Sequence, residues 1–348
     1  MRVISKYLAA SALCSLACAA DLSVGAVTAS PGQRARGVLQ VPAGVDAGTT
    51  IPVIVINGAL SGPTLALVAG AHGTEYASIL ALHRLAAIID ARSLSGAVVI
   101  LPLLNIASFS QMVPHLNPVD GKNMNRFYPG KPDGTQTERV SWAVTKSVLE
   151  KCDYLIDYHG GDLDENLRRY AYWADTGQER LDSVSRGMVL AFGLDHIIIQ
   201  HNRTAPAPGG PITVTRHAQM IGKPAIAVEA GHAGTTNAGD IDVLVDGTLN
   251  VMRHLKMLTG DVKPVEHPIW IGSYSVVSSA EDGVFHSMVL PEAYVQKGMT
   301  IGYVTDYSGE KRSEVTAPAS GLVIYIRAVP SLRKGDNVAY IGEPVAGQ

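Results

Sequence analysis

The feature that most constrains the fold of this chain is a series of short apolar runs, each ending at glycine or at a polar side chain. The runs are TLALVAGAHG (64–73), GAVVILPLLN (96–105), DYLIDYHGG (153–161), DHIIIQ (195–200) and KPAIAVEAG (223–231). Segments with helical spacing of leucine and isoleucine lie between several of them, as in EYASILALHRLAAIID (75–90). Strands that are apolar throughout are buried on both faces, so this order predicts an α/β sheet covered by helices on both sides.

The pattern of apolar and turn-forming residues changes after Gly260. From about residue 261 the chain consists of short strand-like runs separated by Gly, Pro and Asp, with little helical periodicity. We therefore predict an α/β domain over residues 21–260 and a small all-β domain over residues 261–348.

The first 20 residues have the composition of an export signal. Arg2 and Lys6 precede the alanine-rich apolar run YLAASALCSLACAA, which ends in small side chains. This predicts a signal peptide over residues 1–20 and a secreted or periplasmic mature protein. SLAC matches a lipoprotein signal imperfectly, so acylation of Cys18 is the less favoured alternative. After cleavage Cys152 remains, which we expect to be a buried, inert thiol.

The charge and hydropathy of the chain exclude several kinds of partner. The formal net charge is -3 and there is no basic stripe, which argues against nucleic acid. No run after the signal is long and apolar enough to cross a bilayer, so we expect no stable membrane insertion after cleavage. Small molecules or short peptides remain as substrates, and the sequence is compatible with an oligomer.

A candidate metal site begins in the segment GAHGTE. His72 and Glu75 stand three residues apart in a turn that enters a helix, where an imidazole and a carboxylate can hold one ion. A catalytic zinc needs three protein ligands and an open position for water, and His159, at the end of another strand, is the candidate third ligand. Ligands of α/β sheets gather beyond the carboxyl ends of strands, which is where these residues are expected.

Four residues around these ligands suit the chemistry of a hydrolase. Glu229 follows a strand at the same expected edge and is the candidate general base, since the base must not itself be a ligand. Asp157, two residues before His159, is expected to orient that imidazole. Asn125 and Arg126, before a Pro-Gly turn, suit a substrate carboxylate that accepts two hydrogen bonds.

The motifs GAHGTE, NMNRFYPG, DYHGG and VEAGHAG, in this order, resemble those of the succinylglutamate desuccinylase/aspartoacylase family, a branch of the zinc carboxypeptidase fold. The resemblance covers residues 63–258 and implies a mixed sheet flanked by helices, with a smaller β domain over part of the site. It also implies one Zn²⁺ ion per chain bound by His72, Glu75 and His159, a general base and acid at Glu229, and a carboxylate-binding pair, Asn125 and Arg126.

Some residues depart from the family pattern or lie outside it. Relatives tend to carry an arginine two residues before the asparagine of NPxDG, where it would stabilise the oxyanion, and this chain has His115 there. An imidazolium can take over that catalytic role, whereas a neutral imidazole does it less well. His232 either lines the pocket or is an ordinary turn histidine. Arg168 and Arg169 either meet an acidic substrate side chain or are solvated.

The segment 316–344 is similar to the half-barrel of biotinyl and lipoyl carriers. It has no lysine in the hairpin setting that a carrier needs, so we expect a structural cover.

These residues favour a zinc-dependent hydrolase that cleaves an amide bond of an N-acyl amino acid or a similar small carboxylate. One alternative is a secreted zinc carboxypeptidase acting on peptides or cell-wall fragments, which needs the same zinc and the same arginine. Another is a non-catalytic binding protein on the same fold, which predicts a broken ligand set.

Overall fold

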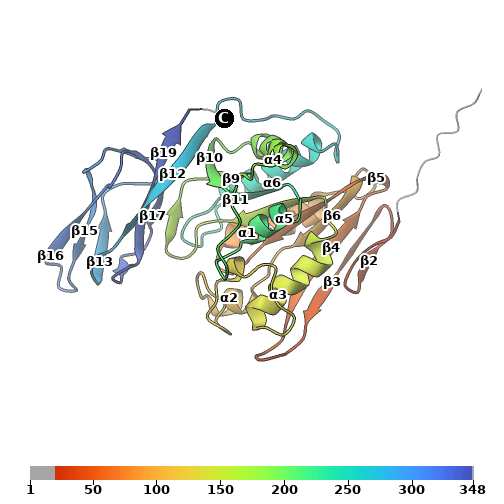
Figure 1. The fold of residues 1–348 in the computed structure, drawn as a ribbon, viewed down its shortest axis with the longest axis horizontal. Helices are drawn as coiled ribbons and strands as arrows, with labels where there is room; N and C mark the ends of the chain where they lie inside the picture. The colour runs from red at the N-terminus through yellow and green to blue at the C-terminus, as the bar shows by residue number, and fades with distance from the viewer. Residues whose placement is uncertain (1–19, 347–348) are drawn as a thin grey trace, which may run out of the picture.

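The fold of the chain is a mixed sheet flanked by helices, extended at one end by a small β domain (Figure 1). The computed structural model describes residues 20–346, so the predicted signal peptide lies outside the described residues except for Ala20. The predicted fold class is confirmed. Among the described residues no helix combines the length and the apolar composition needed to cross a membrane.

Five strands come first, helices and strands then alternate in groups as far as α6, and the described elements after α6 are all strands. The helices are α1 (Tyr76–Ile88), α2 (Ile106–Gln111), η1 (Met124–Arg126), α3 (Gln136–Val144), η2 (Thr145–Leu149), α4 (Glu179–Phe192), α5 (Val214–Met220) and α6 (Ala238–His254). The strands up to residue 201 are β1 (Leu22–Val24), β2 (Val27–Ala29), β3 (Gln33–Val41), β4 (Thr49–Asn57), β5 (Leu60–Ala69), β6 (Ser95–Leu101), β7 (Tyr154–His159), β8 (Glu165–Leu167), β9 (Tyr170–Asp175) and β10 (His196–His201). The later strands are β11 (Ala225–Glu229), β12 (Ile269–Ser278), β13 (Gly283–Ser287), β14 (Tyr294–Val295), β15 (Thr300–Thr305), β16 (Lys311–Thr316), β17 (Gly321–Arg327), β18 (Ser331–Leu332) and β19 (Asn337–Val345).

One sheet of 13 strands runs through the whole molecule. Its order is β14-β17-β19-β12-β10-β9-β11-β7-β5-β6-β4-β3, with β8 beside β17. The pairs β6–β5, β5–β7 and β7–β11 are parallel, as are β9–β10 and β10–β12. The carboxyl ends of β5, β7 and β11 therefore lie side by side at one edge.

The strand β5 shows why these runs are apolar throughout. Leu65 and Leu67 face a core that includes helices α1, α4 and α6, whereas Ala66 and Val68 face a second core with α3 and α5. All four side chains are fully buried. Burying a leucine or valine stabilises the fold by about 1.5–3 kcal/mol, so both faces of the strand select apolar residues.

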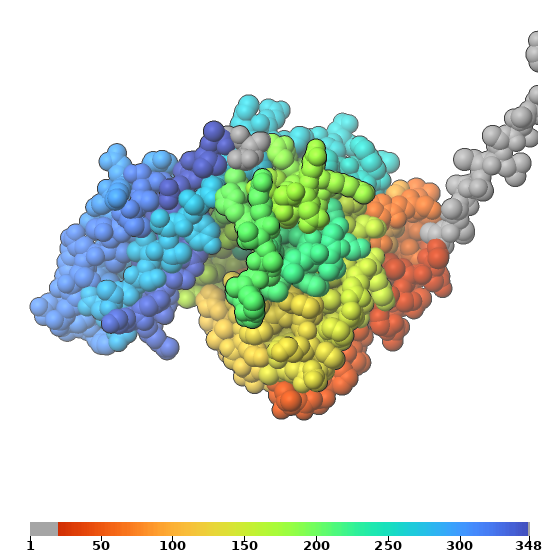
Figure 2. Space-filling view, viewed as in Figure 1, coloured from red at the N-terminus to blue at the C-terminus, as the bar shows by residue number. Residues whose placement is uncertain are grey.

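The β domain is continuous with the large sheet through β12. This strand pairs in parallel with β10 and antiparallel with β19. A second sheet, β16-β15-β13-β18, packs on the first, with Val304, Val323 and Ile341 among the buried residues between them. Figure 2 shows the domain as a lobe beside the α/β body. The predicted boundary at residue 260 falls in the coil before β12 and stays a prediction, because β12 serves both parts.

Cys152 is a buried free thiol, as predicted from the sequence. Burial raises its pKa to about 12, so it stays protonated and unreactive.

Candidate metal centre and active site

The predicted ligands meet at the carboxyl ends of β5, β7 and β11. His72 and Glu75 lie in the turn between β5 and α1, and His159 is the last residue of β7. Glu229, the last residue of β11, pairs in register with His159. Parallel neighbours place their ends at the same edge, so residues about 84 positions apart in sequence come into contact.

Close approach between backbones shapes the turn that holds His72 and Glu75. A Cβ at Gly73 would lie 2.2 Å from the backbone nitrogen of Phe109 in α2, so only glycine fits there. The backbone N–H of Glu75 donates to the carbonyl of His72 at 3.4 Å. Helix α1 then begins at Tyr76, which fixes the carboxylate of Glu75 beside the imidazole.

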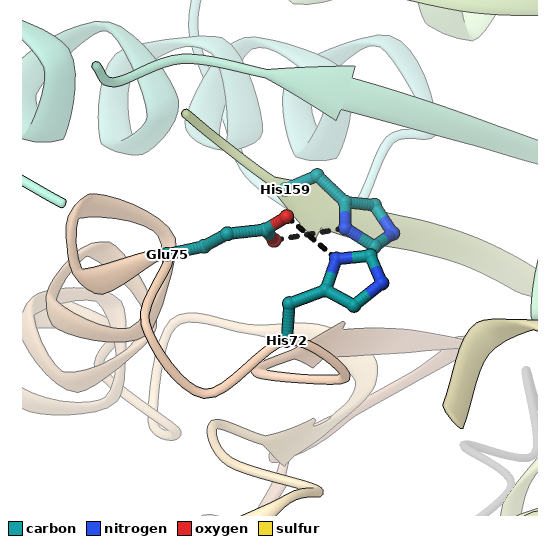
Figure 3. A group of neighbouring side chains, drawn as sticks. All are labelled: His72, Glu75 and His159. Carbon is teal, nitrogen blue, oxygen red and sulfur yellow. Dashed lines mark hydrogen bonds and ion pairs between the residues drawn. The ribbon is translucent and has the colours of Figure 1, made fainter. Parts of the chain in front are cut away.

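The side chains of His72, Glu75 and His159 converge in a buried cluster (Figure 3). Their potential ligand atoms all lie within 4.8 Å of one another. The Nδ1 atom of His72 lies 2.6 Å from one carboxylate oxygen of Glu75, and the Nδ1 atom of His159 lies 2.9 Å from the other. The two imidazoles therefore face the same carboxylate from two sides.

The outer nitrogens of both imidazoles contact acceptors, and His159 Nε2 also lies 2.8 Å from the side-chain nitrogen of Asn125. His159 Nε2 lies 3.0 Å from a carboxylate oxygen of Asp157, and His72 Nε2 lies 3.2 Å from the side-chain oxygen of Asn123. When each Nε2 carries the proton that it donates, each Nδ1 lone pair points at Glu75. Lone pairs and carboxylate oxygens at these distances repel each other unless a cation lies between them. The donor set fits a zinc ion, which binds imidazole nitrogen and carboxylate oxygen.

The pKa values of Glu75 and His159 also indicate that positive charge is stabilised in this cluster. Burial would raise the pKa of Glu75, but attraction to His72 and His159 lowers it to about 2. Burial would lower the pKa of His159, but Asp157 and Glu75 raise it well above its usual value. A divalent cation bound here would supply this positive charge in place of protons.

Glu229 lines the cavity that also contains His72, and no ion pair with its side chain occurs within residues 20–346. Burial raises its pKa well above the usual value, opposed by attraction to His159 and reinforced by repulsion from Glu75. A carboxyl group with a raised pKa, beside a candidate metal-binding cluster, can both accept and release a proton.

The structure separates the roles of Asn125 and Arg126. The side-chain amide of Asn125 is buried, donates to Asp157 at 3.1 Å, and accepts from the backbone N–H of Val214 at 2.8 Å. It therefore positions the residues behind His159, and contact with a substrate carboxylate stays a prediction. Arg126 is exposed to the cavity, where its guanidinium donates to the carbonyl of Asn125 and makes no ion pair among the described residues.

His115 is held among carboxylates. Its Nε2 lies 2.7 Å from Asp164 and its Nδ1 lies 3.4 Å from Asp162. Burial would lower its pKa, but the hydrogen bond to Asp164 and attraction to Glu165 and Asp162 raise it to about 9. This favours the imidazolium form. Because both ring nitrogens face carboxylates, His115 acts on the cavity through its charge, and hydrogen bonding to an oxyanion stays a prediction.

The cluster opens into a cavity of about 470 Å³. An adjoining hollow of about 320 Å³ shares His72, Arg126, Tyr172, Glu229 and Tyr274 with it. The β domain contributes much of the wall, namely Tyr274, Tyr325, Arg327, Asp336, Asn337 and Tyr340. Larger hollows of about 820 and 650 Å³ lie elsewhere and contain none of the predicted site residues.

The remaining basic residues considered in the sequence are engaged in ion pairs. Arg168 bridges Asp195 and Glu292, at 2.8 and 3.0 Å. Arg169 pairs with Asp240 at 2.7 Å, and His232 lies 3.5 Å from the same aspartate.

Sequence reasoning missed two groups of residues that line the cavity. One is the pair Asp164 and Glu165 in the acidic segment DLDE (162–165) directly after DYHGG, whose proximity to His159 in the chain was an available signal. The other is the set of tyrosines from the β domain, which no local pattern connects to the metal cluster.

Comparison with known proteins finds one protein family and a similar deacetylase. The family model described as succinylglutamate desuccinylase/aspartoacylase catalytic domain matches residues 61–255. The chain is 28% identical over 322 residues to N-alpha-acetyl-L-2,4-diaminobutyric acid deacetylase of Halomonas elongata, covering 89% of this chain and 92% of that protein.

Solved structures extend the likeness to the β domain. The product-bound ectoine utilization protein EutE (DoeB) from Ruegeria pomeroyi is 27% identical, with a TM-score of 0.79 over 89% of this chain and 95% of that chain. A succinylglutamate desuccinylase from a Silicibacter species is 25% identical, with a TM-score of 0.80 over 93% of this chain and 100% of that chain.

Proposed function

Because the chain belongs to the succinylglutamate desuccinylase/aspartoacylase family, we propose that it is a zinc-dependent deacylase of small N-acyl amino acids. The observation that carries this proposal is the convergence of His72, Glu75 and His159 at two adjoining cavities that Glu229 also lines, where Glu229 has no ion pair among the described residues. The similarity to a deacetylase over most of both chains supports amide hydrolysis of a small substrate.

In the proposed mechanism His72, Glu75 and His159 would hold one zinc ion. When bound, zinc would supply Lewis-acid chemistry for the amide carbonyl and acidify the attacking water. Glu229 accepts the proton of that water at its carboxylate and donates it to the nitrogen of the leaving amine. Arg126 binds the substrate carboxylate, and Asp157 holds the imidazole of His159 in place.

The size of the cavity favours small substrates over long peptides. Tyr274, Tyr325 and Tyr340 of the β domain form part of the wall of the cavity, whose volume is about 470 Å³. A wall of this kind excludes water and limits the length of the substrate on that side. The carboxypeptidase alternative shares the zinc and Arg126 and is distinguished by substrate length.

The test combines metal analysis with a substrate screen. We expect about one zinc per purified chain, bound weakly or not at all by His159→Ala. We expect Glu229→Gln to retain zinc while its kcat falls by about 10²–10⁴-fold. The screen compares N-acetyl and N-succinyl amino acids with dipeptides and longer peptides. Full activity of Glu229→Gln would overturn the assignment of the base, and exclusive cleavage of peptides would favour the carboxypeptidase.

We further propose that the reaction takes place outside the cytoplasm. Support comes from the apolar, alanine-rich run in the first 20 residues, preceded by Arg2 and Lys6. N-terminal sequencing of the protein from an expressing bacterium tests this: a mature chain beginning near Ala20 is expected, and a cytoplasmic chain that retains Arg2 would contradict it.

A further inference from the structure

Outside the His72–Glu75–His159 cluster and Glu229, the charges that line the cavity are paired except for two. Apart from the metal cluster and Glu229, the carboxylates are those of Asp164, Glu165 and Asp336. Arg327 forms ion pairs with Asp164 at 3.3 Å and Asp336 at 3.2 Å. Within residues 20–346 this leaves Glu165 without an ion pair, and it leaves Arg126 as the cation without one.

Glu165 is held with its carboxylate in the cavity wall. It begins β8, which pairs with β17 so that Glu165 is in register with Arg327. The guanidinium of Arg327 nevertheless forms its ion pairs with Asp164 and Asp336. The Glu165 carboxylate accepts a hydrogen bond from the backbone N–H of Asp162, at 3.1 Å. The carboxylate therefore retains free acceptor positions.

Aromatic side chains line the cavity together with this carboxylate, namely Tyr170, Tyr325 and Tyr340. Burial raises the pKa values of all three tyrosines, and the negative charge of Glu165 adds to this rise. The last two come from the β domain and stand 4.7 Å apart between ring centroids. A carboxylate beside aromatic rings is a suitable environment for an ammonium group, which gains both ion-pair and cation–π attraction.

Burial without a paired cation is energetically costly for Glu165. Desolvation raises its pKa to about 7, although attraction to His115 lowers it. That imidazole is already engaged by Asp164 and Asp162. A ligand cation would relieve this cost.

We propose that Glu165 binds a cationic group of the substrate while Arg126 binds its carboxylate, so that the preferred substrates are N-acyl diamino acids with a free side-chain amine. This inference rests on the proposed deacylase function and names the substrate class for it. Glu165 is thus a specificity-determining residue, and the β domain completes its binding site through Tyr325 and Tyr340.

The experiment compares three N-acetyl amino acids whose side chains have similar size but different charge: 2,4-diaminobutyrate, norvaline and glutamate. We expect the zinc-loaded enzyme to show its highest kcat/KM with the diaminobutyrate derivative. In Glu165→Gln the ratio of kcat/KM for diaminobutyrate over norvaline should fall by about 10- to 100-fold, as expected for losing a hydrogen bond to a charged group. The glutamine keeps an acceptor for the backbone N–H of Asp162 and therefore the local turn.

Glu310→Gln is the matched control, because Glu310 lies exposed in the turn between β15 and β16, outside the cavity lining. This variant should keep the wild-type ratio. If Glu165→Gln lowers kcat/KM for all three substrates equally, its role is structural and the proposal is overturned, while the deacylase function stands. The proposal is also overturned if the wild-type enzyme has its highest kcat/KM with the norvaline or the glutamate derivative.

Binding of the free amino acids, measured by calorimetry, tests the role of Glu165 separately from the deacylase function. Zinc-loaded wild-type protein should bind 2,4-diaminobutyrate more tightly than norvaline, and Glu165→Gln should lose this preference. If that holds but no acyl derivative is cleaved, the deacylase function fails and the role of Glu165 stands. Equal binding of the two amino acids by wild-type protein would refute the role of Glu165.

Discussion

The side chain of Asp157 is expected to control zinc affinity without touching the metal. One of its carboxylate oxygens lies 3.0 Å from His159 Nε2 and 3.1 Å from the amide nitrogen of Asn125. The Asp157→Ala change would leave the N–H of His159 without this acceptor in a buried site, which costs about 1–3 kcal/mol. Removing such a partner of a metal-binding histidine typically weakens metal binding by about 10- to 100-fold, or about 1.4–2.7 kcal/mol.

The variant Asp157→Asn refines this prediction. The other carboxylate oxygen of Asp157 is buried and has no hydrogen-bond partner in the part of the chain that the structure describes. If the asparagine oxygen keeps the contact with His159, its NH₂ group must occupy that partnerless position, at the cost of a buried unsatisfied donor. We therefore expect zinc affinity between those of the wild-type protein and Asp157→Ala.

Zinc dissociation constants measured by competition with a chromophoric chelator test both variants. Asp240→Ala is the control: Asp240 is also buried, but it pairs with Arg169 and does not line the cavity. Thermal unfolding of the zinc-free proteins shows whether each variant folds. A folded Asp157→Ala protein with unchanged zinc affinity would refute the argument that this carboxylate positions His159.

Two further predictions concern the β domain and acid stability. The change Arg327→Met removes the ion pairs of Arg327 with Asp164 and Asp336 in the cavity wall. We expect this variant to have a raised KM and an unchanged zinc content. An unaltered KM in steady-state assays would show that these ion pairs do not shape the site. Burial alone would raise the pKa of Glu138, but the backbone N–H of Thr135 and the ammonium of Lys122 lower it to about 2 from 4.5. The folded-state pKa is depressed, so its contribution to stability is present above pH 4.5 and is lost as pH falls towards about 2. Urea unfolding across this range should show a smaller acid-dependent loss in Glu138→Gln than in wild type, and equal losses would contradict the assignment.

Local sequence patterns were sufficient to find the candidate metal ligands that the fold brings together. His72, Glu75, His159 and Glu229 each follow directly on an apolar run, and the carboxyl ends of parallel strands meet at one edge of a sheet. The chemistry of these residue types then restricts what the edge can bind. The family resemblance, carried by four short motifs, was confirmed by the match over residues 61–255.

The orientation of individual side chains depended on contacts that are distant in sequence. Asn125, expected at a substrate carboxylate, is turned inward by Asp157 and by the backbone of Val214, 89 residues away. His115 is surrounded by carboxylates from a different segment, which favours its imidazolium form. Turn sequences alone do not specify such partners.

The sequence by itself determined the α/β class, the strands that carry the candidate ligands, the types of those ligands and the candidate base, because periodicity, turn residues and ligand chemistry are local properties of the chain. Only the tertiary structure decided that β12 continues the central sheet into the β domain. That continuity brings Tyr325, Arg327 and Tyr340 to the cavity beside Glu165. Strand pairing over more than 150 residues sets this arrangement, and it depends on the packing of the whole sheet, which no short segment encodes.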